Sequence, residues 1–150
     1  MKSVKSNLFL LLSICIAAFA VIVFNPLYAD AKVKDGTYYF SSCRVSSFKV
    51  KGGKMTLKVA GSEGITKKGS SSFNKKKMTV KVNKNCKYYI SGYERLTGKK
   101  SRYRATYKEV KKSISFDSSW YKKNKFYNNR AYSYFVVKNG KIVKIIYFWL

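Results

Sequence analysis

The chain has 150 residues with 32 Lys+Arg, 6 Asp+Glu and no His, which gives a formal net charge of +26 at pH 7. The absence of histidine excludes Ser-His and Cys-His nucleophile pairs, and it removes the commonest metal ligand. The length predicts one domain with a single modest core. So large an excess of positive charge costs stability through self-repulsion, so it either reflects a polyanionic partner or is tolerated.

The first part of the chain has the pattern of a secretory signal peptide. Lys2 and Lys5 precede a run over 8–24 that is apolar apart from one serine. Asn25-Pro26 ends any helix there, because proline cannot continue the hydrogen-bond ladder. The run is short of the roughly 20 residues that a spanning helix requires. An uncleaved N-terminal anchor is the alternative interpretation.

The cleavage site is expected at the end of this segment. Ala29-Asp30-Ala31 fits the small-x-small pattern, so cleavage is predicted after Ala31, with Ala29 as the alternative. The predicted organisation is a signal peptide over 1–31 and a single basic, β-rich domain over 32–150. The mature protein is therefore expected to be secreted or associated with the cell surface.

Two cysteines, Cys43 and Cys86, remain in the predicted domain. A single pair of cysteines in an exported chain indicates one disulfide, which would close a long loop. The alternative is two separate thiols.

Alternating residues predict strands in the first half of the domain. A strand is expected from Thr37 toward Val50, followed by a hairpin turn at Lys51-Gly52-Gly53-Lys54. Met55, Leu57 and Val59 alternate with polar residues and predict the next strand. The polar segment over 61–77 is interpreted as a long loop.

Two further strands are expected at Met78 to Val82 and at Cys86 to Ser91, followed by a basic loop over 92–104. Thr106-Tyr107-Lys108-Glu109 matches a capping box. It predicts a short helix of about two turns that reaches Ile114. The segment over 115–130 is interpreted as a loop.

The C-terminal hairpin is the clearest element of the sequence. Apolar runs over 131–137 and 142–149 flank Lys138-Asn139-Gly140-Lys141, and Asn-Gly is the strongest short hairpin signal. The last strand is apolar on both faces, which predicts a central position. The predicted fold class is therefore mostly β, with about six antiparallel strands in a small barrel or sandwich and one short α-helix.

No motif predicts catalysis, a metal site or a cofactor. Five carboxylates remain in the domain: Asp35, Glu63, Glu94, Glu109 and Asp117. Glu109 is expected in the helix cap and Asp35 in a turn, so a pair of facing acids is poorly supported. We expect a protein that is not an enzyme and that carries no metal and no cofactor.

Basic residues interleaved with aromatics give the positive signal. The candidate polyanion-binding residues are Lys99, Lys100, Arg102 and Arg104 in one cluster, and Trp120, Tyr121, Lys122, Lys123, Lys125, Tyr127 and Arg130 in a second. Cations attract phosphates or sulfates, while aromatic faces stack on bases or sugars. The competing interpretation is structural, because a β domain needs aromatics for its core and soluble residues on its wet face.

The leading functional hypothesis is a secreted binding or structural module. It would attach electrostatically to cell-wall teichoic acid, acidic polysaccharide or extracellular nucleic acid, without sequence-specific recognition. One alternative is a membrane-active, antimicrobial-like cationic protein, although no long basic amphipathic helix is evident. Another is a secreted polyanion hydrolase that uses Glu94 or Asp117 as its acid or base.

Several turn motifs give the chain a family likeness. They are Asp35-Gly36-Thr37-Tyr38 after the signal peptide, the Lys-Gly-Gly-Lys hairpin, and Val137-Lys138-Asn139-Gly140-Lys141-Ile142-Val143 near the end. In these features the chain resembles uncharacterised small exported β-domain proteins of Gram-positive bacteria. The resemblance implies a small exported β domain and no particular activity.

Overall fold

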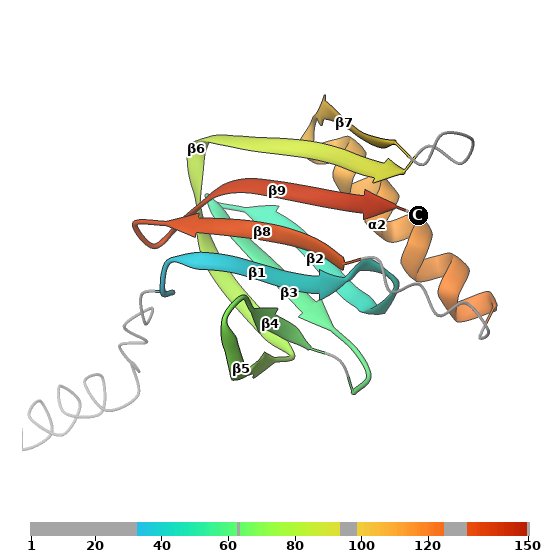
Figure 1. The fold of residues 1–150 in the computed structure, drawn as a ribbon, viewed down its shortest axis with the longest axis horizontal. Coiled ribbons are helices and arrows are strands. Elements are labelled where there is room, and N and C mark those ends of the chain that lie inside the picture. Colours follow the sequence, from blue (N-terminus) through green and yellow to red (C-terminus); the bar gives the residue numbers. More distant parts are fainter. Residues whose placement is uncertain (1–32, 63, 94–98, 125–131, 150) are drawn as a thin grey trace, which may run out of the picture. The chain divides into compact units, whose positions relative to one another are not determined.

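The computed structural model describes residues 33–62, 64–93, 99–124 and 132–149. Within these ranges nine strands form one strongly curled, half-barrel sheet, joined by a 3₁₀ turn, η1 (Ser42–Arg44), and one α-helix, α2 (Tyr107–Lys123) (Figure 1). The mostly β fold with one helix is confirmed, with more strands than the six expected.

The sheet is mixed and not purely antiparallel. Its strands are β1 (Gly36–Ser41), β2 (Val45–Lys51), β3 (Lys54–Val59), β4 (Ile65–Lys67), β5 (Ser70–Lys75), β6 (Lys77–Tyr93), β7 (Lys100–Ala105), β8 (Tyr132–Lys138) and β9 (Lys141–Trp149). Their order is β2-β3-β6-β9-β8-β1-β4-β5, and β7 also pairs with β6. β9 lies centrally, as predicted, but it runs parallel to β6.

β6 replaces two predicted strands with one strand of 17 residues. Its first part pairs with β3 and its last part with β7. The register against β9 shifts between Val82 and Lys87. Such irregularities bend a strand, which allows one strand to serve two parts of the curled sheet.

Two predicted loops contain strands. The segment over 61–77 holds the hairpin of β4 and β5, and β4 pairs with β1 through Tyr39 and Thr66. The segment over 92–104 holds β7, whose register pairs Arg104 with Tyr89. Both segments are polar because they lie at the edge of the sheet, where most side chains face solvent.

The helix begins as predicted and ends later than predicted. The capping box is formed, since the Glu109 N–H donates to the Thr106 hydroxyl and the Glu109 carboxylate accepts from the Thr106 N–H. Hydrogen bonds from the Thr106 backbone and side chain lower the pKa of Glu109. The helix then continues to Lys123, so the predicted loop over 115–130 is wrong as far as that residue.

Tertiary contacts explain the extension of α2. Ile114 and Ser118 lie one turn apart, both are buried, and the Ser118 hydroxyl donates to the Val45 carbonyl at 2.7 Å. Packing of this kind, and not local propensity, supplies most of the stability of a helix in a protein.

The core lies between the inner face of the sheet and α2, which packs against η1, β2, β6 and β9 (Figure 1). Phe40, Phe135 and Ile145 from the sheet and Val110 and Ile114 from the helix are almost completely buried in it. Strand residues that alternate with this set point to the outer face.

The two cysteines do not form the expected disulfide in the structure. Cys43 lies in η1, which packs against α2, whereas Cys86 lies near the middle of β6. Each side chain is buried among its own neighbours. Burial raises the pKa of the Cys86 thiol to about 11, which makes it a poor nucleophile.

The predicted C-terminal hairpin is confirmed. Asn139 and Gly140 adopt positive φ angles of 52° and 69°, as a tight hairpin turn requires. Asp35, which directly precedes β1, binds this turn although it is distant in sequence. Its carboxylate accepts hydrogen bonds from the N–H groups of Asn139 at 2.8 Å and Gly140 at 2.9 Å.

Replacing Asp35 by alanine is expected to lower the free energy of unfolding by about 1–2 kcal/mol, because two backbone N–H groups lose a charged acceptor. Asp35→Asn keeps one oxygen acceptor and should lose less. Urea denaturation of both variants tests this order, and equal stability of all three proteins would contradict it.

Candidate cationic–aromatic face

The outer face of the sheet carries a row of tyrosines. Tyr39 of β1 pairs with Tyr134 of β8, and their ring centroids lie 5.6 Å apart. Tyr134 pairs with Ile146 of β9, which in turn pairs with Tyr89 of β6. Ile146 is completely buried although it is on this outer face, which indicates that the flanking rings cover it. The row therefore crosses four strands.

The cations of β7 extend this row. The Arg104 guanidinium lies 5.4 Å from the Tyr89 ring centroid, and Arg102 donates to the Tyr134 hydroxyl at 3.2 Å. The Lys100 ammonium lies 5.9 Å from the Phe148 ring centroid. We call this set the cationic–aromatic face; it consists of Tyr39, Tyr89, Tyr134, Phe148, Lys100, Arg102 and Arg104.

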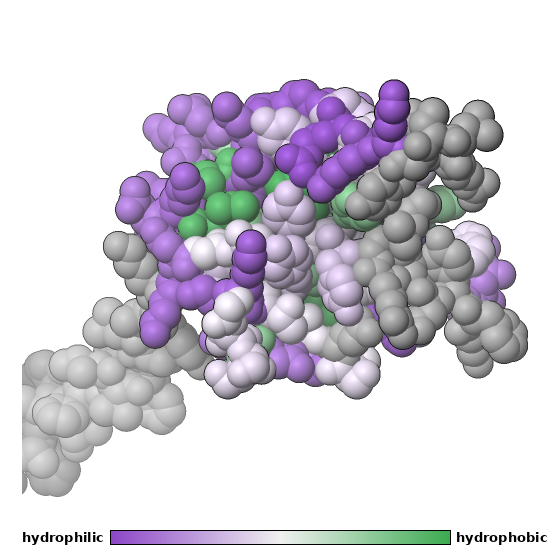
Figure 2. All heavy atoms as spheres, in the orientation of Figure 1, coloured by the Kyte–Doolittle hydropathy of each residue, from purple (hydrophilic) through white to green (hydrophobic). Residues whose placement is uncertain are grey.

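Figure 2 shows the molecule from this side, with strongly hydrophilic side chains along the top and left and side chains of intermediate hydropathy across the middle. The ring contacts of Lys100 and Arg104 and the hydrogen bond of Arg102 limit the rotamers of these side chains, which reduces the entropy lost on binding an anion. Arginine can also hold a carboxylate or phosphate with two parallel hydrogen bonds.

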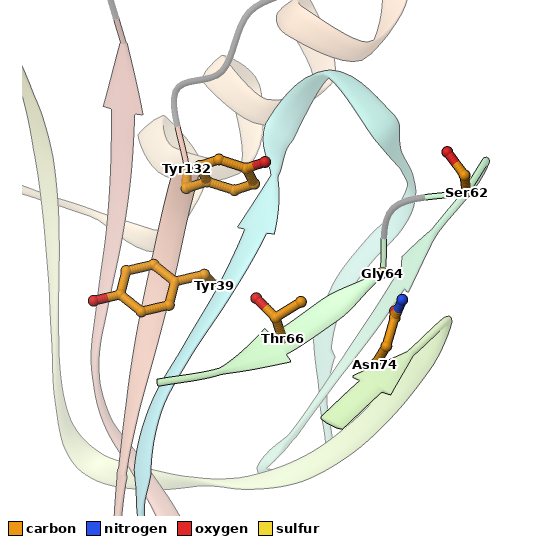
Figure 3. A pocket seen from close by; sticks show the side chains of 6 residues that line it. All are labelled: Tyr39, Ser62, Gly64, Thr66, Asn74 and Tyr132. Carbon is orange, nitrogen blue, oxygen red and sulfur yellow. The ribbon is translucent and has the colours of Figure 1, made fainter. Parts of the chain in front are cut away.

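An open groove of about 570 Å³ continues the face beyond Tyr39. Tyr39 and Tyr132 come from β1 and β8, while Thr66 and Asn74 come from β4 and β5 (Figure 3). Gly64 also lines it, and a Cβ atom at this position would overlap the Asn74 amide oxygen. The glycine therefore lets Asn74 approach the backbone at the groove.

A lysine side chain binds the backbone at the rim of the groove. The Lys76 ammonium donates to the carbonyl oxygens of Gly61 and Ser62, and Ser62 lines the groove. This places the Lys76 ammonium beside a groove whose described lining residues present hydroxyls, an amide and tyrosine rings.

The carboxylates of the described residues form hydrogen bonds outside the cationic–aromatic face and the groove. Asp35 binds the β8–β9 turn, Glu109 caps α2, and Asp117 accepts hydrogen bonds from the hydroxyls of Ser42 and Tyr147. Glu63 and Glu94 lie outside the described residues. Burial raises the pKa of Asp117, opposed by the hydrogen bonds from Ser42 and Tyr147.

The structure unites the first predicted cluster and separates it from the second. Lys100, Arg102 and Arg104 alternate along β7 and share the outer face, with Lys99 just before the strand. Trp120, Tyr121, Lys122 and Lys123 lie at the end of α2, on the inner side of the sheet. The Tyr121 ring is covered by the Arg44 guanidinium at 4.3 Å. Lys125, Tyr127 and Arg130 lie outside the described residues.

Sequence reasoning missed the tyrosines of the outer face and the whole groove. Tyr132 and Tyr134 stand two residues apart in a predicted strand, a spacing that places both on one face. The two-residue spacing could have been read from the sequence. The position of this face in the sheet could not, because it depends on pairing with β1, β4 and β6, which are distant in sequence.

The described residues contain no group of three or more metal-ligating side chains and no helix long and apolar enough to cross a membrane. The chain matches no protein-family model, and no curated protein or solved structure resembles it significantly.

Proposed function

We propose that the protein is an exported, non-enzymatic binding module that attaches to an anionic polymer of the cell envelope or its surroundings through the cationic–aromatic face. The observation that carries the proposal is that Lys100, Arg102 and Arg104 share one face of β7 with the tyrosine row. A long anion laid across the strands would contact charges and ring faces together.

Electrostatics supports a polymer as the partner. A domain with so few acids attracts any polyanion, and each contact that releases a condensed counterion adds to affinity. The ring faces add stacking on sugars or bases that salt does not screen. Binding should therefore have a salt-sensitive part from the cations and a salt-resistant part from the tyrosines.

Neutralising the β7 cations tests the proposal. The triple variant Lys100→Gln, Arg102→Gln, Arg104→Gln should bind heparin or duplex DNA at least about tenfold more weakly at low salt. The slope of log affinity against log salt for duplex DNA should also fall in magnitude by up to about 3, since each lost phosphate contact removes about 0.9.

The matched control removes the same charge from another part of the sheet. Lys49, Lys51 and Lys58 are exposed on β2 and β3, and Lys49→Gln, Lys51→Gln, Lys58→Gln should retain most of the affinity. Equal losses in the two triple variants would mean that net charge alone acts, with no binding face. No binding by the wild-type protein at low salt would refute the electrostatic proposal itself.

One observation favours a second candidate, attachment to an anionic membrane surface. Phe116 and Trp120 lie one turn apart on α2 and are 68% and 38% exposed. Exposed lysines at positions 112 and 123 lie within about one turn of this pair. Aromatics beside lysines suit the headgroup layer of an anionic bilayer.

Vesicle binding separates the two candidates. Phe116→Ser, Trp120→Ser should reduce binding to phosphatidylglycerol vesicles and leave heparin binding unchanged if α2 contacts lipid. If these substitutions change neither binding nor leakage of anionic vesicles, the membrane candidate is refuted and the polymer proposal is unaffected.

A further inference from the structure

We propose that the groove beside Tyr39 holds a sugar ring, so that the polymer bound by the cationic–aromatic face is an acidic polysaccharide. This inference rests on the proposed function and narrows it. A polymer without pyranose rings, such as a nucleic acid or polyphosphate, would use the cations and leave the groove without its ligand.

The chemistry of the groove matches a sugar. Tyr132 is 44% exposed at its edge, and Tyr39 adjoins it from β1. A tyrosine ring can pack against the C–H face of a pyranose, because that face is apolar and the ring is large and rigid. Ser62, Thr66 and Asn74 supply hydroxyl and amide groups that can pair with sugar hydroxyls.

The groove has a suitable size and openness. Its volume of about 570 Å³ lies within the range of about 300–1,000 Å³ that is usual for small-ligand sites. Thr66 pairs with both Tyr39 and Asn74, so three neighbouring strands present these side chains in one row. Figure 3 shows the groove between the tyrosines on one side and Thr66 and Asn74 on the other.

The groove and the cations lie on one continuous path. Tyr39 contacts Tyr134, and the Tyr134 hydroxyl accepts a hydrogen bond from Arg102. From β4 to β7 the path crosses β1, β8, β9 and β6, which at about 4.8 Å per strand spans about 24 Å. A chain of several sugar units can therefore place a ring in the groove and its acidic groups on Arg102 and Arg104.

The charges favour an acidic sugar over a neutral one. Arg102 and Arg104 stand at the end of the path away from the groove. A carboxylate or sulfate beside them gains a charge-assisted hydrogen bond, which is about twice as strong as a neutral one. A neutral polysaccharide would fill the groove and form no ion pair with these arginines.

The test compares two polyanions that differ in having rings. The full protein is titrated with heparin and with inorganic polyphosphate, at low salt and at a salt concentration that suppresses general attraction. The groove variant is Tyr132→Ala, Asn74→Ala. The control variant is Tyr103→Ala, Asn85→Ala, which has the same exposed residue types outside the groove. Circular dichroism confirms that both variants are folded.

The expected result is a loss of about tenfold in heparin affinity for the groove variant at high salt, with unchanged polyphosphate binding and an unaltered control. Equal weakening toward both polymers would overturn the inference, because the groove would then be part of a general anion surface. No weakening toward either polymer would also overturn it, and the proposed function would stand. If the wild-type protein bound neither polymer, both proposals would fall together.

Discussion

Phe135→Ala is expected to reduce the free energy of unfolding by about 3–5 kcal/mol, the usual cost of removing a buried phenylalanine. Phe135 is completely buried in β8. Its ring lies parallel to that of Tyr38 with centroids 5.1 Å apart, and 6.4 Å from that of Phe40. The substitution leaves a cavity between two rigid rings on a neighbouring strand, which cannot collapse to fill it.

Urea denaturation of the wild-type protein, Phe135→Ala and Phe116→Ala provides the measurement. Phe116 is 68% exposed on α2, so the same substitution there should change stability by less than about 1 kcal/mol. A small midpoint shift for Phe135→Ala would contradict the position of β8 in the core. If Phe135→Ala does not accumulate in folded form, Phe135→Leu replaces it. This variant should lose less unfolding free energy than Phe135→Ala but more than Phe116→Ala.

Local patterns were sufficient for the elements built from adjacent residues. The Gly-Gly turn after Lys51 and the Asn-Gly turn after Lys138 form as predicted, because positive φ angles belong to the turn residues themselves. The alternation at Met55, Leu57 and Val59 placed all three in the core. The capping box at Thr106 likewise depends only on residues three apart.

Elements that depend on distant partners were missed. α2 runs beyond Ile114 because Ser118 and Asp117 bond to Val45, Ser42 and Tyr147. β4 and β5 are polar, and they form as strands because β1 offers an edge to β4. The parallel pairing of β6 with β9 joins segments far apart in the chain, for which hydrophobic periodicity holds no information.

Only part of the candidate site could be predicted from the sequence, for the same reason. Clustered charge identified Lys100, Arg102 and Arg104, since they are neighbours in sequence. Their aromatic partners Tyr89, Tyr134 and Phe148 come from three other strands, and only the register brings them together. A second cluster at the end of α2 looked equivalent by composition but lies on the other side of the sheet.

Asp117→Ala is expected to lower the free energy of unfolding by about 2–4 kcal/mol, because each buried hydroxyl that loses its acceptor costs about 1–3 kcal/mol. Ser42 donates to the Asp117 carboxylate at 2.7 Å and Tyr147 donates to the same oxygen at 3.0 Å. These bonds tie α2 to η1 and to β9. Asp117→Asn keeps one oxygen in that place, so it should retain both bonds and most of the stability.

The wild-type protein and Asp117→Asn differ in how their stability depends on pH. Burial raises the pKa of Asp117 above its ordinary value of 3.8, so the folded protein binds this proton more tightly than the unfolded chain does. The stabilisation from protonation is complete below the unfolded pKa and is lost as pH rises through the folded pKa. Asparagine does not ionise, so Asp117→Asn should gain stability relative to the wild-type protein as pH rises from about 3.8 toward neutrality.

Thermal unfolding at constant ionic strength between acid and neutral pH measures this difference. Salt near 0.15 M screens the extra repulsion that follows from removing one acid of a strongly basic protein. If the stability difference between the wild-type protein and Asp117→Asn did not change with pH, the pKa of Asp117 would not be raised. If the wild-type protein instead became more stable relative to Asp117→Asn as pH rises, the hydrogen bonds to Asp117 would outweigh the effect of burial on its pKa. The carboxylate would then be held ionised between helix and sheet.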